Sequence, residues 1–193
     1  MITHLQGKLV EKNPTELVVE CNGVGYLLHI SLYTYEQLGT DENIKIFTHL
    51  LVREDAQTLY GFAQTTERDL FLKLISVSGI GAGTARTMLS SLSPEQIIQA
   101  IASEDVNTIK GVKGIGLKTA QRVIIDLKDK LNDVATTANN LVLKGNTNQN
   151  EALSALETLG YTKKQSQKVI ENIVKQEPEA SVETIIKLAL KKL

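Results

Sequence analysis

Residues 77–89 read VSGIGAGTARTML, and residues 112–124 repeat the pattern 35 positions later as VKGIGLKTAQRVI. Six of the 13 positions are identical: the leading Val, the Gly-Ile-Gly and the Thr-Ala pair. A repeat this close within one chain predicts one structural unit that is used twice. Each copy places a Gly-Ile-Gly turn ahead of an amphipathic helix. Because two such turns can grip the two strands of one duplex, nucleic-acid binding is the first hypothesis.

The predicted turns have the chemistry of a phosphate site. A helix N-terminus leaves backbone N–H groups unpaired and carries partial positive charge. Glycine allows positive φ and lets a phosphate approach the backbone without a Cβ in the way. Contacts of this kind carry no base information, so we expect binding that is independent of DNA sequence. The candidate DNA-binding residues are Gly79, Ile80, Gly81, Gly83, Thr84, Lys113, Gly114, Ile115, Gly116, Lys118, Thr119 and Arg122.

Charge is unevenly distributed along the chain, although the formal net charge is only −1. Residues 1–62 carry four basic and eight acidic side chains, whereas residues 108–132 carry six basic and two acidic ones. The basic cluster surrounds the second Gly-Ile-Gly turn. This distribution is typical of a protein that binds phosphate on one surface and repels it on another.

Composition excludes several classes of protein. No stretch of the 193 residues reaches the roughly 18 apolar residues of a membrane span, and the first residues lack the layout of a signal peptide. The single cysteine, Cys21, cannot form an internal disulfide, which indicates a buried thiol in a reducing cytoplasm. Aromatic residues make up 4% of the chain and Trp is absent, which argues against stacking on unpaired bases.

The fold class is predicted to be multidomain, with separate α and β parts. Residues 1–63 read as a small closed barrel of the OB type, with a helical insertion over 33–38. Its five strands are expected near 2–11, 15–21, 24–31, 44–53 and 57–62. Asn22-Gly23 is a strong signal for a tight hairpin between the second and third strands.

Helical periodicity replaces the strand pattern after the barrel. Residues 64–132 predict a domain of five helices that carries both glycine turns, with its last helix ending near Lys130. Residues 133–150 are rich in Asn and Thr and hold no period, which favours a flexible linker. Residues 151–193 predict a three-helix bundle, which is too small for an enzyme and is better suited to docking a partner.

Other chemistry is poorly supported. Residues 111–119 resemble a phosphate loop, but Leu117 separates the last glycine from the lysine, and no strand precedes the segment. The three histidines have no metal-ligand spacing, and none of the serines near the first turn has a positioned base. We therefore expect no catalytic residues, no metal and no cofactor.

Several segments together resemble the RuvA family, the Holliday-junction-binding subunits of the bacterial branch-migration machine. The similarity covers the whole chain. Its first segments are MITHLQGKL, NGVGYLLHIS and LLVREDAQTLYGF in the barrel. They are followed by SGIGAGTA, by KGIGLKTAQRVIIDLKDKL, and by LETLGY in the C-terminal module. Helix-hairpin-helix turns occur in many DNA-repair proteins, but their combination with REDAQTLYGF in a preceding barrel is highly specific.

The resemblance implies roles that spacing alone does not. It implies a homotetramer, or two stacked tetramers, that holds an open four-way junction with the tandem helix-hairpin-helix domain of each subunit. Glu54 and Asp55 match an acidic pin at the fourfold centre, where repulsion of phosphate would help to part the strands. The C-terminal module would bind RuvB, the hexameric ATPase, with Leu156, Leu159 and Tyr161 as contact candidates that could equally be core. Whether a RuvC-type resolvase shares the complex is left open.

This chain departs from the family at Gly83, where a basic residue is expected. The first hairpin must then rely on backbone amides and Thr84, and the second hairpin should dominate binding. Two other functions stay open at this point. A metal-dependent nuclease could use Glu54 and Asp55, although a third ligand is missing, and a general helix-hairpin-helix or single-strand-binding protein could use the same domains.

Overall fold

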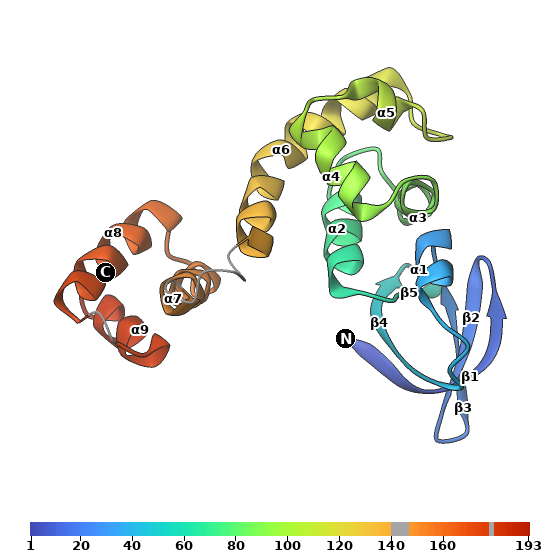
Figure 1. Ribbon diagram of the computed structural model, residues 1–193, viewed down its shortest axis with the longest axis horizontal. Coiled ribbons are helices and arrows are strands. Elements are labelled where there is room, and N and C mark those ends of the chain that lie inside the picture. Colours follow the sequence, from blue (N-terminus) through green and yellow to red (C-terminus); the bar gives the residue numbers. More distant parts are fainter. Residues whose placement is uncertain (140–146, 178–179) are drawn as a thin grey trace. The chain divides into compact units, whose positions relative to one another are not determined.

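The five strands expected at the N-terminus form a closed barrel in the computed structural model of the protein, which describes residues 1–139, 147–177 and 180–193 (Figure 1). Neighbouring strands follow the order β1-β2-β3-β5-β4, and β4 pairs back onto β1. Asn22 and Gly23 have φ values of 51° and 82°, as the predicted tight hairpin requires. The elements are β1 (His4–Asn13), β2 (Glu16–Cys21), β3 (Val24–His29), α1 (Leu32–Gln37), β4 (Asn43–Val52) and β5 (Gln57–Phe62).

Alternation along the strands builds the barrel core, because successive side chains point to opposite faces of a sheet. Leu17 and Val19 on β2 are fully buried, while Val18 between them and Glu16 and Glu20 on either side are not. The buried cluster consists of Leu5, Leu17, Val19, Leu28, Ile30, Ile44, Ile46 and Leu59.

Five helices follow the barrel, as the change of period predicts. Helix α2 leads from the end of β5 toward the hairpin helices (Figure 1). Ser93 begins α4 with a capping box shared with Gln96, and Asp105 caps α5 by accepting from the N–H groups of Asn107 and Thr108. The helices are α2 (Thr65–Ile75), α3 (Ala82–Ser91), α4 (Pro94–Ala102), α5 (Val106–Lys110) and α6 (Leu117–Asn139).

Barrel and hairpin helices share one compact unit, Met1–Asn132. Phe71 of α2 is fully buried, with its ring 4.9 Å from Phe62 and 5.1 Å from Tyr60, both on β5. Beside this cluster, Glu67 of α2 is also fully buried. Its carboxylate accepts from the hydroxyls of two barrel residues, Ser31 and Thr34. Apolar packing and a buried polar contact therefore join α2 to the barrel.

The expected linker over 133–150 is helical at both ends. Helix α6 continues to Asn139, well beyond the predicted end near Lys130, and α7 (Thr147–Thr158) begins before residue 151. Residues 133–139 contain no glycine or proline, so nothing in their backbone chemistry stops the helix. The middle of the expected linker, residues 140–146, lies outside the described residues.

The C-terminal unit, Asp133–Leu193, contains the three-helix arrangement that the sequence predicts. It is completed by α8 (Lys163–Gln176) and α9 (Val182–Leu190), with Ser181 capping α9. Its core is small, as expected for so short a segment. The fully or nearly buried members are Ala152, Leu156, Ile170, Ile173, Ile185 and Ala189. None of the helices in the described ranges could cross a bilayer.

Candidate nucleic-acid interface

The two Gly-Ile-Gly turns have nearly the same backbone geometry. Gly79 and Gly114, the first glycine of each turn, have φ of +95° and +90°, a region that strains other residues. In the first turn the Ile80 N–H donates to the carbonyl of residue 77 at 3.0 Å, and in the second the Ile115 N–H donates to the carbonyl of residue 112 at 3.1 Å. The prediction of one unit used twice is therefore confirmed at the level of the backbone.

Ile80 and Ile115 fix these turns from inside. Their side chains are only 4% and 5% exposed, as expected if they plug into the helix pairs. Their place among the candidate DNA-binding residues therefore depends on their backbone groups, because a buried side chain cannot touch DNA. At these two positions only the backbone remains available to a ligand.

The helix that follows the first turn, α3, begins without a side-chain cap. Gly81 is the N-cap of α3, with φ −86° and ψ 167°, and supplies no capping side chain. The first intrahelical bond runs from Ala85 N–H to Gly81 O at 2.9 Å, so the N–H groups before it have no partner within the helix. The second repeat shows the same bond, from Ala120 N–H to Gly116 O at 2.9 Å.

Neither a positive φ nor contact with a described residue requires glycine at three of the helix-start positions. A Cβ built at Gly81, Gly83 or Gly116 meets nothing within 4 Å, and none of the three has positive φ. The free space above them is open to a ligand that approaches the backbone closely, such as a phosphate.

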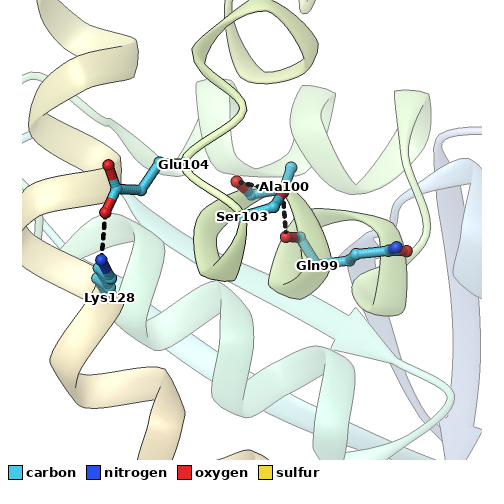
Figure 2. A network of polar contacts seen from close by, with 5 residues as sticks. All are labelled: Gln99, Ala100, Ser103, Glu104 and Lys128. Atoms are coloured by element: carbon cyan, nitrogen blue, oxygen red, sulfur yellow. Dashed lines mark hydrogen bonds and ion pairs between the residues drawn. The ribbon is translucent and has the colours of Figure 1, made fainter.

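Positive charge gathers at the second turn. Lys113, Lys118 and Arg122 are exposed, while Thr84 and Thr119 in the two helix starts are half-buried. Lys128, further along α6, belongs less to this surface because it forms an ion pair with Glu104. Figure 2 shows this pair, which the sequence did not indicate, joining the turn between α4 and α5 to α6. Glu104 has φ +56°, and the nearby Lys128 ammonium holds the pKa of its carboxyl below the usual value.

The two hairpins also contact each other. Arg122 of α6 donates through its Nη1 to the carbonyl oxygen of Ser78 in the first turn, at 3.3 Å. Gly79 lies beside Thr119, whose methyl carbon is 3.8 Å from where a Gly79 Cβ would stand. The sequence did not lead us to include Ser78 in the site. The signal that could have identified it is the repeat, which aligns Ser78 with Lys113.

Glu54 and Asp55 occupy the tip of the turn between β4 and β5. The Arg53 N–H donates to Ala56 O at 2.8 Å and closes the turn, so the two acids stand at its outer end and are exposed. The preceding Val52 is 62% exposed, an apolar position beside the acids that the sequence analysis did not single out.

The three contact candidates in the C-terminal module differ in exposure. Leu156 is fully buried in the module's core, which agrees with the alternative that this residue is core and leaves its side chain no surface for a partner. Tyr161 is half-buried and packs against the same core. Leu159, at 59% exposed, is the one of the three that offers a large apolar surface to a partner.

A five-stranded barrel, an acidic hairpin tip and two glycine turns on one unit define a class of protein: a tandem helix-hairpin-helix protein built on an OB-type barrel. Residues 1–61 match the profile of the RuvA N terminal domain, residues 71–129 that of the SAM-like helix-hairpin-helix tandem, and residues 147–193 that of the RuvA C-terminal domain.

Full-length relatives agree with these matches. Proteins named Holliday junction branch migration complex subunit RuvA from Christiangramia forsetii and Flavobacterium psychrophilum are each 58% identical to the chain over 193 residues, covering 100% of both sequences. The protein of the same name from Bacteroides thetaiotaomicron is 49% identical over 201 aligned residues, again with 100% coverage of both. The chain belongs to the RuvA family.

Proposed function

We propose that the protein binds four-way (Holliday) junction DNA by its shape, independently of sequence, as the non-motor subunit of an ATP-dependent branch-migration complex in recombination and repair. The observation that carries this proposal is the pair of glycine turns. Both expose helix-start amides below open space, and exposed lysines stand beside the second turn. The names of the relatives point to the same ligand.

The acidic tip favours a junction over a continuous duplex as the ligand. Glu54 and Asp55 are exposed at the end of a hairpin, and two carboxylates repel a phosphate backbone that passes close to them. In a homotetramer, four copies of this tip would meet at the strand crossover, where the repulsion would favour separated strands. The proposal includes this tetramer and leaves the stacking of two tetramers to experiment.

The C-terminal module is proposed to bind the motor, a RuvB-type hexameric ATPase that supplies the catalytic activity of the complex. Of the three candidate residues, Leu159 is the one whose side chain is free to contact such a partner. The chain itself would use no cofactor. We also place the protein in the cytoplasm, with the DNA and the ATP that the motor uses.

A junction nuclease is the weaker alternative. The described residues contain no group of three or more His, Cys, Asp or Glu that could hold a metal ion, and Glu54 and Asp55 stand on a solvent-exposed turn. Two-metal cleavage of DNA needs more ligands than this pair provides.

A mobility-shift panel without divalent metal tests the proposal. We expect tight binding of a four-way junction, weaker binding of linear duplex and little binding of single strands. Affinity should be similar for unrelated arm sequences and should fall by about 0.9 log unit per log unit of salt for each phosphate that is neutralised. A strong preference for one arm sequence, or equal binding of all three DNA forms, would contradict the proposal.

A further inference from the structure

The two hairpins are unequal in charge, although their backbones match. At the repeat offset of 35 residues, the three cations Lys113, Lys118 and Arg122 of the second copy align with Ser78, Gly83 and Thr87 of the first. Each cation of the second copy thus has a neutral counterpart in the first. The first hairpin therefore contributes helix-start amides with no cation at the matching positions.

Arg86 is the single cation within residues 77–89, and it is engaged elsewhere. Its Nη1 donates to the carbonyl oxygen of Thr15 in the barrel at 3.3 Å and lies 3.4 Å from Nδ1 of His29. Arg86 is half-buried and faces the barrel, whereas the positions of the first hairpin that match the cations of the second carry no charge of their own.

Arg122 lies against the first hairpin, although it belongs to the helix of the second. Its Nη1 donates to Ser78 O, and in the same place Thr119 lies beside Gly79. The reverse contact does not exist in the described part of the fold. Thr87, which matches Arg122, donates its hydroxyl to Gly83 O within its own helix at 3.0 Å, and a Cβ at Gly114 would meet nothing within 4 Å.

We propose that Arg122 serves the first hairpin: it holds the Ser78-Gly79 turn against α6 and supplies the positive charge that binds a DNA phosphate there. A guanidinium has five N–H donors in a fixed fork, so one bond to a carbonyl leaves others for a phosphate diester. Arg122 is exposed and can present them. Lys113 and Lys118 remain as the cations of the second turn. This inference rests on the proposed function. It assigns Arg122 to the DNA contacts of the first hairpin, whereas the sequence analysis assigned it to the second.

The experiment is a double-mutant cycle on junction affinity in the full-length protein. Gly83→Lys places a cation on the first hairpin itself, where the space around the Cβ is open. It is combined with Arg122→Gln and, as a matched control on the second hairpin, with Lys118→Gln. Affinity for a four-way junction is measured by fluorescence anisotropy over a salt series, and thermal unfolding of each variant is recorded.

We expect Arg122→Gln to weaken binding by about tenfold and to lower the salt slope by about 0.9 for each site lost. Gly83→Lys should restore most of that loss. In the Lys118→Gln background, Gly83→Lys should raise junction affinity no more than it does in the wild type. The reason is that the first hairpin of that variant still has Arg122.

Three results would overturn the inference. If Gly83→Lys rescues both glutamine variants equally, Arg122 belongs to the second site. If Arg122→Gln loses affinity with an unchanged salt slope and a lowered melting temperature, Arg122 has only a structural role. If Arg122→Gln changes neither junction affinity nor the salt slope, the inference fails while the proposed function stands. Failure of the wild-type protein to prefer a four-way junction over linear duplex would instead refute the proposed function.

Discussion

Alanine substitution of the two glycines in the second turn separates the folding of the hairpin from its binding. Gly114 has φ +90°, whereas Gly116 is outside the positive-φ region, and a Cβ at either position meets nothing within 4 Å. The added methyl group therefore strains the backbone at Gly114 only. At Gly116 it stands in the open space where the proposed phosphate approaches.

The expected magnitudes follow from this difference. Gly114→Ala should cost about 1–2 kcal/mol of stability, the usual cost of the left-handed conformation for a residue with a Cβ. Gly116→Ala should change stability little, because the smaller loss of chain entropy by alanine offsets its poorer fit to the N-cap position at the start of α6. It should also remove a charge-assisted bond from backbone N–H to phosphate, worth about 1.5–3 kcal/mol, or roughly 10- to 150-fold in affinity.

The assay pairs thermal unfolding with a junction mobility shift at fixed salt. The informative result is a Gly116→Ala protein that is as stable as the wild type and binds the junction poorly. If that protein binds like the wild type, no phosphate approaches the amides of the second turn, and the open space at Gly116 is not a phosphate site. The matched pair Gly79→Ala and Gly81→Ala repeats the test on the first turn, where φ is +95° and −86°.

Three further predictions concern other parts of the molecule. Changing Glu54 and Asp55 together to Lys should preserve junction binding but reduce its preference over linear duplex, because repelling charges become attracting ones; loss of all DNA binding with the fold intact would contradict repulsion as their role. Burial raises the pKa of the Glu67 carboxyl above its usual value, so the wild type should lose stability as pH rises from about 4.5 through that raised pKa. In chemical unfolding at several pH values, Glu67→Gln should remove this pH dependence and be more stable than the wild type at neutral pH. Glu67→Ala should instead lower the free energy of unfolding by about 1–3 kcal/mol, because the hydroxyls of Ser31 and Thr34 lose their acceptor. Leu159→Ser should weaken capture of the partner ATPase without changing the melting temperature, while Leu156→Ala, the core control, should destabilise the module by about 2–5 kcal/mol; equal capture by Leu159→Ser and wild type would remove Leu159 from that surface.

Local patterns in the sequence predicted the parts of the fold that depend on local geometry. The alternating runs located the five strands, Asn22-Gly23 located a hairpin, and the repeated glycines located two turns with positive φ. These features follow from backbone sterics and side-chain period, which a single sequence displays directly. The extension of α6 to Asn139 was missed because a polar composition was given more weight than the absence of any helix-breaking residue.

Contacts between distant residues could not be predicted in the same way. The pairs Arg122–Ser78 and Glu104–Lys128 join residues 44 and 24 positions apart, and nothing in the local pattern of either partner marks the other. Glu67 reads as an ordinary acid in the first turn of a helix, yet the fold buries it completely. Leu156 and Leu159 are both leucines near one helix end, and only the packing of three helices makes one core and the other surface.

The length of strand β5 sets how far the acidic tip lies from helix α2, and this distance can take only certain values. One end of the strand is next to the tip, and the other carries Phe62, which is packed against Phe71. Its six residues at about 3.3 Å each set a span of roughly 20 Å between tip and helix. Adding one residue would turn every later side chain to the opposite face of the barrel, so the span can change only in steps of two residues, about 7 Å each, taken in β4 and β5 together. Between those steps, the distance from the acids to the hairpin helices is held by the alternation of the barrel core itself.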